Sequence, residues 1–155
     1  IGWPYAVDEA LAERQDVAAV AIRVEGADPT PALRYRRTER SVRVVDAWDP
    51  ILERVRLLLV PADAIGPGGA LVPEGTSEVL ATLGPGVRES WLVGGVGRVL
   101  PARLFDAVHA AAAGAEIVRL EVFDRLAGPR GAESPVDAVK RVDAPVAPEL
   151  LRPLE

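Results

Sequence analysis

Short apolar runs rich in valine and leucine recur along the chain and alternate with amphipathic stretches. Runs typical of β-strands lie at 17–24, 41–46, 55–60, 70–72, 91–93 and 117–123. Apolar residues at helical spacing predict helices over 6–14, 50–54, 77–83 and 101–113. Because strands and helices alternate in this order, the pattern favours an α/β fold with a mostly parallel sheet.

The stretch from Val55 to Gly84 carries the most information about a possible site. It predicts a strand that is apolar throughout after Arg56 and is therefore covered on both faces. Asp63 follows this strand, at the end where parallel α/β sheets bind ligands, and is our candidate catalytic residue. An aspartate that only accepts hydrogen bonds from the NH groups of a turn would leave the same pattern in the sequence.

Other residues could contact an anion through backbone NH groups or a guanidinium group. These candidate ligand-binding residues are Gly68, Gly69, Gly75, Thr76, Gly95, Gly97 and Arg98. Glycines in tight turns need no ligand to explain them, and the Gly75-Thr76 step fits ordinary helix capping equally well. The Gly95-Val96-Gly97 step is similar to a dinucleotide-binding fingerprint, but Leu100 stands in place of the third glycine.

The composition of the 155-residue chain narrows the function classes. With a net charge of -5 and a pI near 5.0, it offers no electrostatic reason to bind nucleic acid, and we interpret the basic run Arg34–Arg40 as a solvated face. The absence of cysteine excludes thiolate chemistry and a single histidine excludes a multi-histidine site, so we expect neither a metal nor a cofactor. No apolar run approaches ~20 residues and no signal-like segment opens the sequence, which predicts a cytoplasmic protein without a membrane partner.

We expect one domain over residues 1–155, because a hydrophobic fraction of 49% suffices for a single core. From Asp124 onward proline and glycine become more frequent, and no periodic core element is evident before Pro148. We therefore interpret the segment 124–148 as a Pro/Gly-rich surface excursion within that domain.

The order of motifs resembles the eIF2B α/β/δ-like superfamily, whose relatives include methylthioribose-1-phosphate isomerase and ribose-1,5-bisphosphate isomerase. These proteins carry a hydrophobic strand, a Gly-Ala-Asp triplet, a glycine turn and an Asn-Lys-x-Gly-Thr motif. Here Pro61-Ala62-Asp63, Gly66–Gly69 and Val72-Pro73-Glu74-Gly75-Thr76 follow the strand in that order. The resemblance covers residues 40–125, and Pro148-Glu149-Leu150 adds a weaker match.

The resemblance implies the C-terminal domain of that superfamily, a three-layer, mostly parallel Rossmann-like sheet related to the NagB, RpiA and CoA-transferase folds. It further implies an acid–base role for Asp63 towards a phosphorylated small molecule, and pairing as a homodimer. The sequence departs from the family at Val72 and Pro73, which replace the Asn-Lys pair, and in having no cysteine. We therefore expect a catalytically degenerate module that binds a phosphorylated small molecule or serves assembly. The alternative is a sugar-phosphate (aldose–ketose) isomerase in which Asp63 works with a group from elsewhere.

Overall fold

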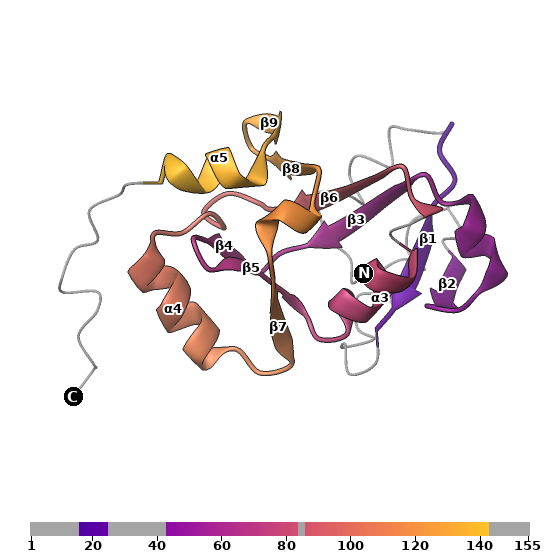
Figure 1. The fold of residues 1–155 in the computed structure, drawn as a ribbon, viewed down its shortest axis with the longest axis horizontal. Coiled ribbons are helices and arrows are strands. Elements are labelled where there is room, and N and C mark those ends of the chain that lie inside the picture. Colours follow the sequence, from indigo (N-terminus) through magenta and orange to yellow (C-terminus); the bar gives the residue numbers. More distant parts are fainter. Residues whose placement is uncertain (1–15, 25–42, 84–85, 143–155) are drawn as a thin grey trace.

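The computed structural model describes residues 16–24, 43–83 and 86–142 (Figure 1). The strands in these ranges are β1 (Val20–Arg23), β2 (Arg43–Asp46), β3 (Leu57–Pro61), β4 (Ala64–Gly66), β5 (Gly69–Pro73), β6 (Glu89–Val93), β7 (Ala115–Val118), β8 (Arg125–Gly128) and β9 (Gly131–Glu133). The helices are α3 (Thr76–Leu83), α4 (Ala102–Ala111) and α5 (Pro135–Lys140), with 3-10 helices η2 (Pro50–Arg54) and η4 (Leu120–Val122). The predicted helix at 6–14, the basic run Arg34–Arg40, and residues 143–155 lie outside the described residues.

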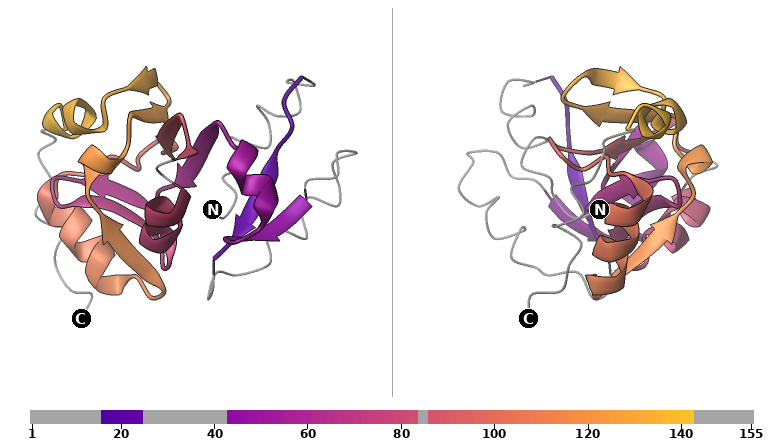
Figure 2. Two further views of the ribbon diagram at one scale, coloured as in Figure 1. Left: turned by 45° about the vertical axis from the view of Figure 1, so that its right-hand side comes forward. Right: turned by 90° about the vertical axis from the view of Figure 1, so that its left-hand side faces the viewer.

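The described strands belong to three sheets. β3, β6 and β8 are parallel neighbours, and β9 extends this sheet as an antiparallel edge strand. β4, β5 and β7 form an antiparallel sheet, and β1 pairs in parallel with β2. Figure 2 shows the β1–β2 pair at one end of the molecule and α4 at the other. A mixed α/β fold is thus confirmed, whereas the three-layer Rossmann-like arrangement stays a prediction. The expected predominance of parallel pairing is not found among the described strands, since three pairings are parallel and three are antiparallel.

The chain reversal after β4 explains why not all strands are parallel. Gly66 pairs with Gly69, so that only Pro67 and Gly68 remain for the turn between β4 and β5. A two-residue connection joins antiparallel strands, whereas parallel strands need a long crossover. The glycine turn seen in the sequence therefore builds a hairpin, and its second strand then recruits β7 as a third, antiparallel strand.

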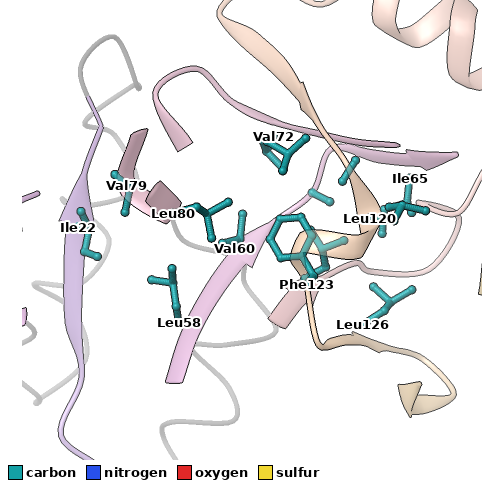
Figure 3. Close-up of a cluster of buried hydrophobic side chains, with 14 of the residues drawn as sticks. Ile22, Leu58, Val60, Ile65, Val72, Val79, Leu80, Leu120, Phe123 and Leu126 are labelled. Atoms are coloured by element: carbon teal, nitrogen blue, oxygen red, sulfur yellow. The ribbon is translucent and has the colours of Figure 1, made fainter. Parts of the chain in front are cut away.

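Side chains from all three sheets meet in one main hydrophobic cluster (Figure 3). Strand β5 contributes to two clusters, because its successive side chains point to opposite faces. Ala70 and Val72 lie in the main cluster, whereas Leu71 packs with Ala64 and Phe105 beneath α4. The β4–β5–β7 sheet is therefore a layer between α4 and the main cluster.

Strand β3 and η2 form where the pattern predicts them, with one difference. The carboxylate of Asp49 accepts a hydrogen bond from the backbone NH of Ile51, as expected for a helix start with proline at the first position. In β3, Leu58 and Val60 are buried but Leu57 is 42% exposed. The prediction that both faces of this strand are covered is therefore wrong, because the second face is only partly shielded.

The strand predicted at 117–123 is wrong in its second half. Strand β7 ends at Val118, and η4 turns the chain before β8 begins. The turn is fixed at Asp124, whose carboxylate accepts a hydrogen bond from Ser90 N at 2.8 Å and whose own NH donates to Ser90 O at 2.9 Å. These bonds align the chain for pairing with β6, a long-range cause that the local pattern of apolar residues does not contain.

The described part of the segment expected to be a surface excursion contains regular elements that place three buried residues, Leu126, Pro135 and Ala138, while its other residues are exposed or half-buried. β8 pairs with β6, and Leu126 at its centre is 1% exposed. α5 follows with Ser134 as its N-cap and buries Ala138 against the main cluster. β8 contains a single large apolar residue, Leu126, and α5 spans only six residues, so neither shows a period, which is why the sequence pattern missed them.

Candidate functional site

The carboxyl ends of β3 and β6 bring Asp63 and Arg98 together. Arg98 Nη1 donates a hydrogen bond to the backbone oxygen of Asp63 at 2.7 Å and lies 3.8 Å from its carboxylate oxygen Oδ1. Both side chains face solvent, at 64% exposure for Asp63 and 50% for Arg98. The arrangement is an open ion pair at the sheet edge where α/β proteins bind ligands.

The loop after β6 is held beside this pair by backbone bonds. Ile65 N donates to Arg98 O at 2.8 Å, and Leu100 N donates back to Ile65 O at 2.7 Å. Within the loop, Arg98 N donates to Gly95 O at 3.3 Å, and Gly97 has a φ of +74°, which favours glycine. Four of the predicted residues, Asp63, Gly95, Gly97 and Arg98, therefore share one location.

The chemistry available to this pair is limited by the nature of its cation. A guanidinium group stays protonated at all physiological pH values, so Arg98 can hold an anion but cannot exchange a proton. The carboxyl group of Asp63, by contrast, is a group that can accept or donate a proton in catalysis. Isomerisation of an aldose to a ketose needs proton transfers at two centres, and the pair supplies only one group suited to them.

The start of α3 is already occupied by groups of the protein. Thr76 is buried and its hydroxyl donates to Pro73 O at 2.6 Å. The NH of Ser77 donates to the carboxylate of Glu116, on β7, at 2.6 Å. Gly75 has a φ of +87°, and a Cβ there would lie 2.4 Å from a methyl group of Val24. These contacts leave no free place for an anion at the NH group of Ser77, since the carboxylate of Glu116 stands where a phosphate would bind.

The glycines of the turn belong to a third location. Gly68 and Gly69 lie at one end of β5 and Gly75 beyond the other, and the four residue steps of the strand span roughly 13 Å at the usual rise per residue. The structure therefore distributes the predicted ligand residues over three places and does not unite them in one pocket.

A cleft next to Gly68 and Gly69 is the feature that sequence reasoning missed. It has a volume of about 420 Å³ and lies between the β4–β5 turn, η4 and α5, with Pro67, Gly68, Gly69, Arg119, Leu120, Glu121, Val136, Val139 and Lys140 as its lining. Its basic side chains are Arg119, directly before η4, and Lys140 of α5, and the pattern predicted neither of these helices, so the sequence contained no signal that both residues would line one cleft.

The described residues hold neither a cluster of metal-ligating side chains nor a membrane-spanning helix. Residues 16–24, 43–83 and 86–142 contain no group of three or more histidine, cysteine, aspartate or glutamate side chains placed to hold a metal ion. No helix within the same ranges has the length and apolar character needed to cross a bilayer.

Comparisons with known proteins add a fold but no activity. No protein-family model matches the chain, and no curated protein matches it. Among solved structures, the crystal structure of eIF2B beta from Chaetomium thermophilum matches with a TM-score of 0.56 and 13% sequence identity, over 83% of this chain and 49% of that one. The chain thus spans about half of the length of that protein. The similarity shows an eIF2B-like α/β fold, whereas the relationship to the isomerases and the assignment to the C-terminal domain stay predictions.

Proposed function

We propose that this chain is a catalytically degenerate eIF2B-like module that acts by pairing with a second copy and not by turnover. The observation that carries the proposal is Trp48, a tryptophan that is 69% exposed in the turn between β2 and η2. Exposed apolar residues are common singly, but tryptophan is one of the side chains enriched among those that dominate binding energy at interfaces.

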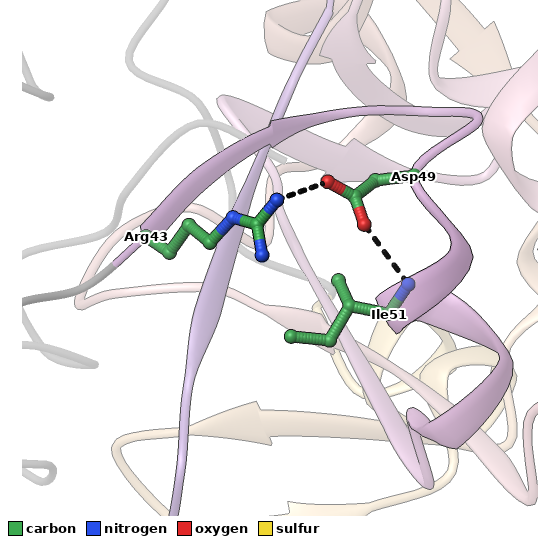
Figure 4. Close-up of polar contacts among 3 residues, drawn as sticks. All are labelled: Arg43, Asp49 and Ile51. Carbon is green, nitrogen blue, oxygen red and sulfur yellow. Dashed lines mark hydrogen bonds and ion pairs between the residues drawn. The ribbon is translucent and has the colours of Figure 1, made fainter.

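The turn that carries Trp48 is fixed by its neighbour Asp49 (Figure 4). One carboxylate oxygen of Asp49 accepts from the NH of Ile51 at 2.9 Å, and the other accepts from Arg43 Nη2 at 2.9 Å. Asp49 Oδ2 and Arg43 also form an ion pair that ties the turn to β2. A rigid turn presents the indole ring at low cost in conformational entropy, which favours its use in a contact between copies.

Replacing Trp48 by alanine is expected to weaken self-association without unfolding the chain. If the indole is a dominant contact, its loss raises the dimer dissociation constant by at least about 30-fold. Sedimentation velocity over a micromolar concentration series measures this change. Val96→Ala is the matched control, because Val96 is also an exposed apolar side chain but lies in the loop after β6. A wild-type protein that remains monomeric, or a Trp48→Ala variant that pairs normally, contradicts the proposal.

Two other roles rest on the Asp63–Arg98 pair. We propose a phosphorylated small molecule as a ligand of this loop, since the Arg98 guanidinium and the backbone of Gly95 and Gly97 lie open to solvent. The enzymatic alternative is a sugar-phosphate isomerase with Asp63 as acid–base group and a partner from elsewhere. The exposed position of Asp63 at the carboxyl ends of two parallel strands is what favours it.

We expect no turnover of ribose-1,5-bisphosphate or methylthioribose-1-phosphate by the purified chain, because Arg98 cannot serve as the second proton-transfer group. The measurement compares wild type with Asp63→Asn in a coupled or NMR assay. Turnover by wild type that disappears in Asp63→Asn would establish the isomerase and overturn the degenerate module. Turnover that is equal in both proteins would point to a contaminating enzyme.

A further inference from the structure

We infer that the cleft between the β4–β5 turn, η4 and α5 is a binding site for a small organic anion with an apolar body, such as an aryl carboxylate or aryl phosphate. The lining of the cleft includes neither Asp63 nor Arg98, and binding in it does not require pairing with a second copy of the chain. Its volume of about 420 Å³ lies in the lower part of the range of small-molecule sites, roughly 300–1,000 Å³.

The turn that forms one wall is held in place by close packing. A Cβ at Gly69 would lie 2.6 Å from the backbone oxygen of Val118, and one at Gly68 would lie 3.1 Å from the ring of Phe105. At Gly69 only glycine allows the turn to approach β7 this closely, and at Gly68 a side chain would displace the ring of Phe105. The backbone along this side of the cleft is therefore preformed, as is usual in ligand sites.

The opposite wall is apolar and anchored. Val136 and Val139 of α5 pack against the main cluster, to which Leu120 of η4 also belongs. The position of α5 is fixed at its ends, where Ser134 caps the helix and Arg141 forms an ion pair with Glu133 of β9. An apolar group placed between these walls would leave water without requiring the helix to move.

The basic side chains of the cleft, Arg119 and Lys140, form exposed ion pairs in which a bound anion can take the place of the carboxylate. Arg119 lies 3.5 Å from Glu121, and Lys140 lies 3.5 Å from Asp137, with all four side chains largely exposed. Exposed ion pairs of this kind contribute little to stability, so an anion can replace either carboxylate at small cost. A ligand that engages both cations gains two charge-assisted hydrogen bonds, and its apolar body rests on the valines.

Isothermal titration calorimetry with phenyl phosphate and benzoate tests the two headgroups, and inorganic phosphate tests the need for the apolar body. We expect at least one aryl anion to bind about tenfold more tightly than inorganic phosphate, the factor expected for partial burial of one ring. Lys140→Gln and Arg119→Gln are each expected to weaken its binding by about tenfold, as for the loss of one hydrogen bond to a charged group. Arg130→Gln, in the β8–β9 turn outside the cleft lining, is the matched control and should bind as wild type.

Lys140 also allows a direct readout, because it is the only lysine of the chain. Apart from the α-amino group of the polypeptide, Lys140 is therefore the only target of an amine-reactive reagent. The bound aryl anion should slow modification of Lys140, which mass spectrometry of the peptide containing it measures. The site is refuted if neither aryl anion binds at millimolar concentration, if inorganic phosphate binds as tightly, or if neither cleft variant weakens binding. A loss of binding in Arg98→Gln with normal binding in Lys140→Gln places the anion at the Asp63–Arg98 pair instead and likewise refutes the cleft, leaving the proposed assembly role untouched.

Discussion

Replacing Gly69 by alanine is expected to lower the free energy of unfolding by about 3 kcal/mol or more, because a left-handed backbone and a steric clash act together. Gly69 has a φ of +133°, a conformation that residues with a Cβ rarely adopt. The added methyl group would also lie 2.6 Å from the oxygen of Val118 and 2.7 Å from a methyl group of Ile117. The nearer of these atoms belongs to the backbone of β7, which cannot rotate away. The strain therefore spreads to the pairing of β5 with β7.

Urea denaturation followed by circular dichroism measures this change, and Gly86→Ala is its control. Gly86 is exposed, has no unusual φ, and its Cβ would meet nothing within 4 Å. The control is therefore expected to shift stability by less than about 0.5 kcal/mol. Equal stabilities of the two variants would show that the β4–β5 turn does not have the described conformation.

Leu126→Ala is expected to destabilise the fold by about 2–5 kcal/mol, the usual cost of truncating a buried leucine. Leu126 is 1% exposed, pairs across from Leu92 of β6, and points into the main cluster (Figure 3). The side chain lies on β8, between β6 and β9, and long connections join β3, β6 and β8, so the cavity cannot be closed by a small shift of one loop.

Leu57→Ala is the matched control for this substitution in the same denaturation experiment. Leu57 is a leucine in the same β3–β6–β8–β9 sheet, but its side chain is 42% exposed. Its truncation is expected to cost about 1 kcal/mol or less, because little apolar area is lost from the core. If Leu126→Ala were as stable as Leu57→Ala, β8 would lie at the surface, as expected for the whole segment 124–148 from the sequence alone.

The sequence predicted those helices and strands that are determined by neighbouring residues, such as a proline at a helix start or a run of apolar residues. The 3-10 helix after Asp49 begins with proline at its first position, and α4 begins directly after Pro101, its N-cap residue. The apolar run of β3 likewise marks a strand. What these patterns could not contain is the partner of each strand. That β7 pairs with β5, and β8 with β6, depends on contacts between residues far apart in sequence.

The same distinction applies to the candidate site. The sequence placed Asp63 after the carboxyl end of β3, and the structure has it there, beside Arg98 from the loop after the next parallel strand. That these residues bind a ligand stays a prediction. The sequence could not show that Glu116 reaches the start of α3, because that contact joins two segments across a crossover. Nor could it show the cleft, since Arg119 and Lys140 meet there only after η4 and α5 have folded.

The position of β8 has a consequence for the order in which the protein is made. Until residues 125–128 leave the ribosome, β6 has a free edge, and Leu92 lacks the neighbour that covers it. An unpaired parallel strand with an apolar face is a template for association with other chains. The nascent polypeptide is therefore prone to aggregation until β8 pairs with β6. Substitutions that slow this pairing are expected to lower the yield of folded protein even where they leave the stability of the folded state unchanged.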